Sequence, residues 1–514
     1  MTNAEQFINE IQNGYYPKGK YITLGKGKLE GEIQPEATIK IPLKTFNRHG
    51  LIAGATGTGK TKTLQIILEQ LSNQGVPSLV MDVKGDLSGI AKPGDASNKH
   101  IIERMQKLEI PYDASGFPVE FLTLSGEKGI KLRATVTEFG PLLLSKILNL
   151  NDTQESIISV VFKFCDDNAL PLVDLEDLKK VLRYINDDDV GEEQFKKNYG
   201  GVSTSSLGAI QRKIVALEQQ GADQFFGEPS FDVQDLLKTK DNKGVVSIVR
   251  LTDIQDKPQL FSTFMLSLLA EIYANFPEQG DSDQPKLCLF IDEAHLIFNE
   301  ASKALLNQIE TVVKLIRSKG IGVFFITQVP GDIPEAVLSQ LGLKVQHALR
   351  GFTGKDRKEI KKAVENYPTS TFYKTDELIT ELGIGEALIT ALNEKGVPTP
   401  LVYTHLVAPQ SRMGILDDSE INELVSKSDL VEKYNQSVNR ESAYEILTQK
   451  LETAAQEKVP EEAKAKTSTK KSDDKSFMEE IIESRMARDI GRTFTREITR
   501  SILGALGIKR TYRR

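Results

Sequence analysis

A run of glycine, threonine and lysine residues from Gly54 to Lys62 has the composition of a phosphate-binding loop. The run reads GATGTGKTK, and its glycines let the backbone turn its N–H groups inward around phosphate oxygens. Apolar residues 51–53 precede it, and leucine and isoleucine follow it at helical spacing, which predicts strand, loop and helix in that order. The alternative, a glycine-rich turn formed by chance, leaves the patterns on both sides unexplained.

Each residue of this loop is a candidate ligand of ATP. The predicted nucleotide-binding residues are Gly54, Ala55, Thr56, Gly57, Thr58, Gly59, Lys60, Thr61 and Lys62. Lys60 is expected to reach the β- and γ-phosphates, and the hydroxyl of Thr61 is expected to bind Mg²⁺. The helix that follows would present its positive N-terminal end to the phosphates.

Two carboxylates follow a second apolar run. Residues 287–291 are continuously apolar, as in a buried parallel strand, and Asp292 and Glu293 come directly after them. Ligands of open α/β sheets lie at the carboxyl ends of the strands, so both side chains should face the phosphate loop. We therefore predict Asp292 as a magnesium ligand and Glu293 as the catalytic group that polarises water; the alternative is an ordinary helix cap.

Gln328 follows a third apolar run, residues 323–326, and its amide could contact the γ-phosphate or the attacking water. The alternative is a turn before Pro330. The letters DEAH, residues 292–295, also name a class of strand-separating helicases, which require a second α/β lobe and a late glycine–arginine motif. Neither is evident after Gln328, so we interpret His295 as a helix residue rather than a catalytic one.

The elements that must position these residues predict an α/β fold with a mostly parallel sheet. Further strands are expected at 77–86 and 244–251 and a helix at 261–276, which together suggest a RecA-like P-loop core with an extra strand between its two nucleotide motifs. The predicted organisation is a strand-rich segment (1–45), the core (46–110 and 241–415), a mostly helical insertion (111–240), a helical extension (416–451), a flexible linker (452–475) and a basic C-terminal helix (476–514).

The composition restricts the class of protein. The 514 residues carry a net charge of -7, which argues against a surface that is basic throughout, although local loops could still hold DNA. Cys165 and Cys288 lie in apolar runs and are expected to be buried thiols, and the scattered histidines have no zinc-binding spacing. Neither a membrane span nor a signal peptide is evident, so a cytoplasmic location without membrane attachment is expected.

The ordered set GATGTGKT, MDVKGDLSG, FIDEAHLIF and FITQVPGDIP resembles the HerA/FtsK superfamily of ring-forming ATPases. The likeness is closest to the bacterial HerA-helicase-like, or YjgR-type, family, and it runs from residue 41 to 414 and again from 485 to 504. This resemblance implies a homo-oligomer, a hexameric ring in which an arginine from the next subunit completes each ATP site. Arg350, which ends the apolar run 345–349, is the preferred candidate, before Arg317 and Arg357; the alternative is an ordinary salt bridge.

Two parts of the chain and the overall function keep open alternatives. Asp82, Lys84 and Asp86 would border either the nucleotide or the ring pore. Five arginines on one face of residues 485–500 could dock on a neighbouring subunit, bind nucleic-acid phosphate or face solvent. The protein would be a motor that moves double-stranded DNA, or a regulatory ATPase whose nucleotide state controls assembly with an unidentified partner protein.

Overall fold

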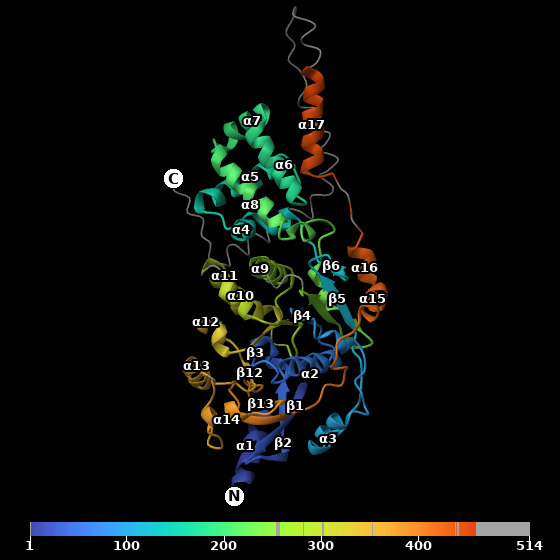
Figure 1. The fold of residues 1–514 in the computed structure, drawn as a ribbon, viewed down its shortest axis with the longest axis vertical. Coiled ribbons are helices and arrows are strands. Elements are labelled where there is room, and N and C mark those ends of the chain that lie inside the picture. The colour runs from blue at the N-terminus through green and yellow to red at the C-terminus, as the bar shows by residue number, and fades with distance from the viewer. Residues whose placement is uncertain are drawn as a thin grey trace, which may run out of the picture. The chain divides into compact units, whose positions relative to one another are not determined.

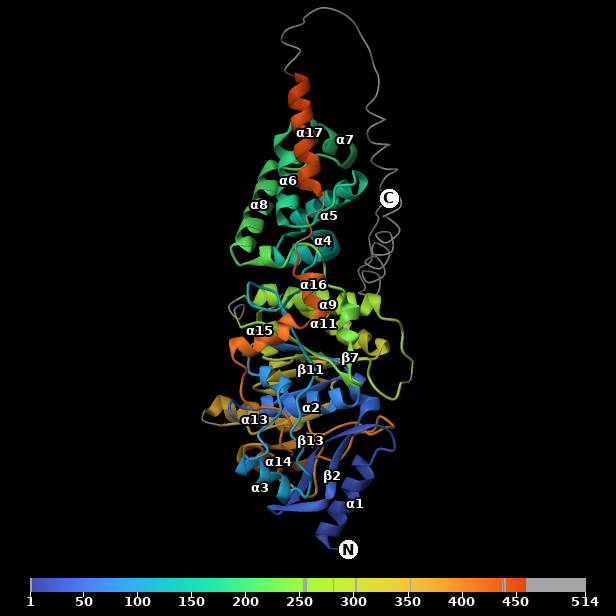
Figure 2. The same cartoon turned by 90° about the vertical axis from the view of Figure 1, so that its right-hand side faces the viewer.

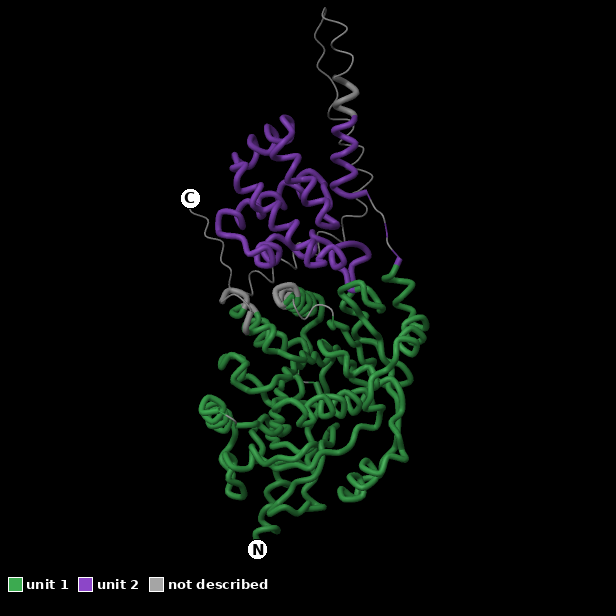
Figure 3. The backbone as a smooth tube through the Cα atoms, viewed as in Figure 1, with its two compact units in different colours: residues 1–131, 232–435 green, residues 132–231, 436–514 purple. Residues whose placement is uncertain are grey.

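The computed structural model describes residues 2–252, 257–280, 282–300, 303–351, 353–436, 438 and 441–458. The chain divides into two compact units, shown in Figure 3. Unit 1 comprises residues 1–131 and 232–435, and unit 2 comprises residues 132–231 and 436–514. The predicted basic helix at 476–514 and most of the predicted linker lie outside the described residues.

Unit 1 is built on one large twelve-stranded sheet (Figure 1). In spatial order its strands are β2 (Glu32–Pro42), β1 (Tyr21–Leu29), β14 (Val402–Leu406), β13 (Glu386–Thr390), β12 (Leu343–Gln346), β3 (Gly50–Ala53), β11 (Ile321–Thr327), β10 (Leu287–Ile291), β4 (Ser78–Asp82), β9 (Val246–Arg250), β5 (Val119–Thr123) and β6 (Ile130–Lys131). A separate antiparallel pair consists of β7 (Thr239–Lys240) and β8 (Lys243–Gly244).

The eight strands from β12 to β6 are parallel, and the four from β13 to β2 are antiparallel. Strand β11 lies between β3 and β10, so the phosphate loop and the acid pair are separated by one strand, as the sequence predicted. Every residue of β3, β4, β10 and β11 is buried, which fits strands that are covered on both faces. The predicted α/β class with a mostly parallel sheet is confirmed.

Helices cover this sheet on both sides. The helices of unit 1 are α1 (Asn3–Tyr15), α2 (Lys60–Asn73), α3 (Lys99–Lys107), α9 (Pro258–Asn275), α10 (His295–Glu300), α11 (Lys303–Ile316), α12 (Glu335–Leu338), α13 (Gly354–Glu365), α14 (Thr375–Glu381), α15 (Asp418–Ser426) and α16 (Asp429–Tyr434). In Figure 2, β11 lies between α2 on one side and α9 and α11 on the other.

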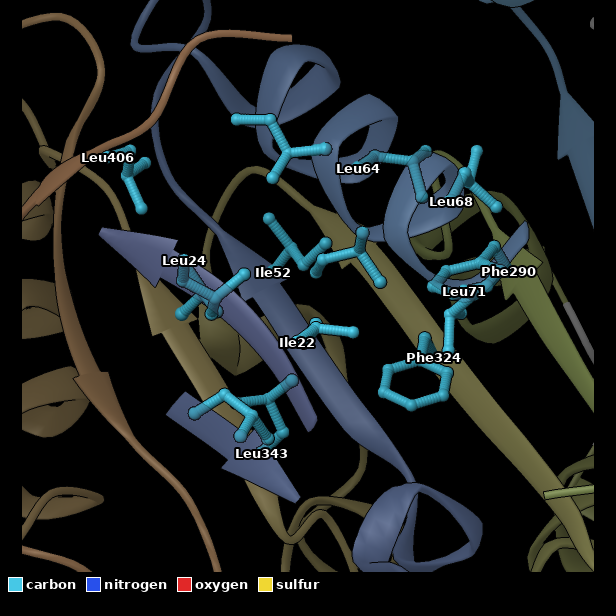
Figure 4. Packing of buried hydrophobic residues seen from close by; sticks show 14 of the residues in the cluster. Ile22, Leu24, Ile52, Leu64, Leu68, Leu71, Phe290, Phe324, Leu343 and Leu406 are labelled. Carbon is cyan, nitrogen blue, oxygen red and sulfur yellow. The ribbon is translucent and has the colours of Figure 1, made fainter. Parts of the chain in front are cut away.

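A large apolar cluster fills the space between α2 and the sheet (Figure 4). Leu64, Leu68 and Leu71 recur on one face of α2, and they pack with strand residues such as Ile52 and Phe290. The cluster extends to the antiparallel strands, so the edge of the sheet and the parallel core share one hydrophobic interior. This packing fixes the start of α2, and with it the phosphate loop, on the sheet.

Unit 2 is helical. It contains α4 (Val136–Ile147), α5 (Asp152–Asp167), α6 (Leu175–Asp187), α7 (Asp189–Tyr199), α8 (Thr204–Glu218) and α17 (Ala443–Lys458). The predicted insertion spans residues 111–240, whereas the first segment of unit 2 spans 132–231, because β5 and β6 pair within the sheet of unit 1. Residues 452–458 of the predicted linker continue α17 as helix.

Three further expectations can be compared with the described residues. The strand-rich segment 1–45 forms β1 and β2 at the sheet edge, but it begins with α1, whose Phe7, Ile11 and Tyr15 are buried at helical spacing. Cys165 and Cys288 are both buried and free. None of the helices in the described part of the chain has the length and apolar character needed to span a bilayer.

Candidate functional site

The phosphate loop connects the end of β3 with the start of α2. Three glycines have backbone conformations that side chains rarely adopt, with φ of +154° at Gly54, +78° at Gly57 and +109° at Gly59. Gly59 is the N-cap of α2 and brings no side chain to the helix end. The first N–H groups of α2 have no partners within the helix, so they are free to receive an anion.

Lys60, the first residue of α2, lies inside this loop. Its ammonium group donates hydrogen bonds to the carbonyl oxygens of Gly54, at 2.6 Å, and Ala55, at 3.1 Å. The residue is only 7% exposed, and burial lowers its pKa, with a further lowering by the charge of Lys84. A cation that is poorly hydrated and surrounded by loop carbonyls is well placed to exchange these contacts for phosphate oxygens.

His347, which follows β12, packs against the phosphate loop. Its Nε2 lies 2.9 Å from the hydroxyl of Thr63, and both side chains are buried. A Cβ atom added at Gly54 would lie 2.5 Å from that of His347, so the loop and the histidine are in close contact. The N–H of Ala55 also donates to the carbonyl of Ala348 at 2.8 Å. The sequence showed no role for His347.

The predicted carboxylates lie at the carboxyl end of the sheet. Asp292 follows β10, and Asp82 ends the neighbouring strand β4, so the pairing of these strands brings the two acids together. One carboxylate oxygen from each of Asp82, Asp86 and Asp292 lies within 4.8 Å of the others. Burial, followed by the charge of Glu293, raises the pKa of Asp292 to about 7, and burial, followed by Asp86, raises that of Asp82 to about 6.

One of these three acids, Asp86, contacts Thr61, whose side chain was predicted to bind magnesium. The Thr61 hydroxyl donates to Oδ2 of Asp86 at 3.1 Å, while Oδ1 of Asp86 is buried without a hydrogen-bond partner. Hydroxyl and carboxylate oxygens are the ligands that Mg²⁺ prefers, and a cation would offset both the burial and the repulsion that raise the two pKa values. The donor set therefore fits a magnesium ion, with Asp82 and Asp86 added to the predicted Thr61 and Asp292.

Glu293 is buried and has an unusual backbone conformation, with φ of +47°. Its carboxylate forms an ion pair with Lys84, and its second oxygen lies 3.1 Å from Nδ1 of His295. A non-glycine residue held in this region is often found at a functional site. His295 begins α10, so it is a helix residue as predicted, although its ring also reaches Glu293.

Gln328 lies next to the loop, whereas Arg350 does not bond to it. The carbonyl of Gln328 accepts from the N–H of Gly54 at 3.1 Å, and its side chain is exposed. Arg350 is exposed and donates to the carbonyl of Thr380 at 3.0 Å. The alternative candidates Arg317 and Arg357 are exposed as well, so each of the three arginines is accessible to a neighbouring chain.

Comparison with known proteins gives matches over most of the chain. The family model described as Helicase HerA-like C-terminal matches residues 28–511. The DNA double-strand break repair helicase HerA of Saccharolobus solfataricus is 22% identical over 376 residues, which are 72% of this chain and 67% of that protein. The protein of the same name from Sulfurisphaera tokodaii is 23% identical over 395 residues, or 76% of this chain and 70% of the relative.

A solved structure shares the fold. The bacterial conjugative coupling protein TrwBdeltaN70, in its unbound monoclinic form, has a TM-score of 0.51 and 14% sequence identity. The similarity covers 80% of this chain and 94% of that one. At this identity the match bears on the fold alone, and it agrees with the α/β architecture described above.

Proposed function

The chain belongs to the family described as Helicase HerA-like C-terminal, and on that premise we propose that it is a magnesium-dependent ATPase that assembles as a ring and moves double-stranded DNA. The observation that carries this proposal is the convergence of Lys60, Thr61, Asp292 and Glu293 from two strands that are not adjacent in the sheet. These are the groups required to bind a nucleoside triphosphate and activate water against it.

The chain's own residues divide the work of ATP hydrolysis. The N–H groups at the start of α2 and the ammonium of Lys60 would bind the phosphates, and Glu293 would accept the proton of the attacking water. Thr61, Asp82, Asp86 and Asp292 would hold Mg²⁺. When bound there, the metal supplies positive charge that offsets the charge of the β- and γ-phosphates.

Two residues would complete the site. The exposed amide of Gln328 follows the strand between the two nucleotide motifs, which is a position suited to orienting the water or contacting the γ-phosphate. Arg350 would act on the ATP of the neighbouring subunit, since its guanidinium is exposed; within its own chain it donates to the Thr380 carbonyl. An arginine supplied in this way would stabilise charge on the transferring phosphoryl group.

The DNA substrate is supported by the relatives. The two HerA proteins compared above are each named a DNA double-strand break repair helicase. A ring that encloses a duplex needs cations only where its loops meet phosphate, so a net charge of -7 is compatible with such a substrate.

Steady-state ATP hydrolysis with and without long double-stranded DNA tests the proposal. We expect DNA to stimulate turnover, Lys60→Ala to abolish it, and Glu293→Gln to lower kcat by roughly 10²- to 10⁴-fold while ATP binding is retained. Normal turnover by Glu293→Gln would refute the assignment of the catalytic base. Turnover that depends on Lys60 but ignores DNA would instead favour a regulatory ATPase controlled by a partner protein.

A further inference from the structure

Lys84 lies in a tight turn that directly follows β4. The carboxylate of Asp82 accepts hydrogen bonds from the N–H groups of Gly85, at 2.7 Å, and Leu87, at 3.2 Å. Gly85 has φ of +74°, which a glycine adopts without strain. The turn is therefore fixed at both ends, and it projects the Lys84 side chain from a defined place beside the sheet.

The ammonium of Lys84 is paired with Glu293, although the two side chains differ greatly in exposure. The Glu293 side chain is 8% exposed, whereas that of Lys84 is 40% exposed. Burial lowers the pKa of Lys84, but the hydrogen bond to Glu293 and the charges of Asp292, Glu293 and Asp86 together outweigh burial, so the pKa is raised overall. The carboxylate proposed as the catalytic base is thus neutralised by an adjacent cation, which makes it a poor acceptor for the proton of water.

Lys84 is also close to the phosphate loop. Asp86, two residues after Lys84, accepts a hydrogen bond from the hydroxyl of Thr61 at 3.1 Å, so the turn that carries Lys84 is joined to the residue next to Lys60. The charge of Lys84 also lowers the pKa of Lys60, after burial, which agrees with this placement. The repulsion between the two ammonium groups would be offset when the oxygens of a bound polyphosphate lie between them. The Lys84 side chain is long and partly exposed, so it can turn without rearrangement of the fold.

We propose that Lys84 is a further nucleotide-binding residue that leaves Glu293 for the terminal phosphate when ATP binds. In the nucleotide-free site the ammonium neutralises Glu293, and in the ATP-bound site it neutralises the γ-phosphate. Glu293 is then released to accept a proton from water only when a triphosphate is present. The inference rests on the proposed ATPase function and adds a residue that distinguishes ATP from ADP.

The test is calorimetric titration of the full-length chain with MgADP and with the magnesium complex of the β,γ-imido analogue of ATP. In wild type we expect the triphosphate analogue to bind more tightly than ADP. Lys84→Met should weaken binding of the analogue by about ten-fold and leave ADP affinity nearly unchanged, because a charge-assisted contact to the terminal phosphate is lost. Lys84→Arg, which keeps the charge, should restore most of the preference.

A matched control and a second variant separate the alternatives. Lys427→Met removes an exposed lysine that directly follows α15 and pairs with Glu423 of that helix. This change should alter neither affinity. Glu293→Gln removes the competing carboxylate, so it should tighten binding of the triphosphate analogue, and this gain should vanish when Lys84→Met is added.

The possible outcomes are distinct. Equal losses of analogue and ADP affinity in Lys84→Met would show general damage to the loop and overturn the inference, as would unchanged affinities for both ligands. Wild-type protein that binds neither nucleotide in a Lys60-dependent manner would overturn the proposed ATPase function itself. Lys60-dependent binding of both ligands without any effect of Lys84→Met would leave the ATPase function standing and remove only the role of Lys84.

Discussion

Replacement of His347 by glutamine tests whether a neutral, buried histidine supports the phosphate loop. The ring is completely buried, its Nε2 contacts Thr63, and its Nδ1 has no hydrogen-bond partner. Burial, followed by the positive charge of Lys60, lowers the pKa of His347 to about 4 from its usual value near 6.5. Glutamine places an amide close to the position of Nε2 and does not titrate.

The pKa shift determines the sign and size of the effect. Between pH 6.5 and 4 the unfolded chain binds a proton at His347 and the folded chain does not, so folded wild type loses stability as the pH falls. The two pKa values correspond to a loss of about 2 kcal/mol between pH 7 and pH 5. Below the folded pKa the loss is complete, and above pH 6.5 it is absent.

The assay is urea unfolding of wild type and His347→Gln at about pH 7 and pH 5. Only the difference in the free energy of unfolding between the two proteins is used, because other buried groups, such as Asp292 and His49, contribute equally to both. We expect the stability advantage of wild type to shrink by about 2 kcal/mol on acidification. An advantage that stays constant between the two pH values would refute the claim that His347 is held neutral, and the exposed His100→Gln provides a control.

Two further predictions concern the loop and its acids. Gly57→Ala should lower the free energy of unfolding, measured with urea, by about 1–2 kcal/mol, because of backbone strain alone. Gly54→Ala should lower it further, because the added Cβ would clash with His347. Equal losses in the two variants would contradict this description of the loop. Asp86→Asn should raise the Mg²⁺ concentration for half-maximal ATP turnover by roughly ten-fold, since the partner of Thr61 loses its charge; an unchanged requirement would exclude Asp86 from the metal site.

Local sequence patterns predicted those parts of the site that lie where one strand ends or one helix begins. The glycine and lysine spacing of residues 54–62 describes one strand end, one turn and one helix start, and the acid pair follows an apolar run of typical strand length. In each case the chemistry is carried by residues adjacent in sequence, so neither signal needs information about the rest of the fold.

The remaining groups reach the site through long-range pairing, which single-sequence patterns do not encode. His347 contacts Thr63 because β12 pairs with β3 across nearly 300 residues of sequence. Asp86 was expected to border either the nucleotide or the ring pore, and its bond to Thr61 depends on the turn after β4. The partner of the strand-rich N-terminal segment could not be predicted for the same reason, since β1 pairs with β14, which lies far along the chain.

The pairing of β1 with β14 also constrains how unit 1 can be made on the ribosome. Residues 21–29 emerge early, yet their partner strand at 402–406 is synthesised almost four hundred residues later. Until then the β1–β2 hairpin has an open edge. High contact order of this kind slows folding and exposes nascent chains to misassembly, so the sheet of unit 1 is a candidate client for chaperones during translation.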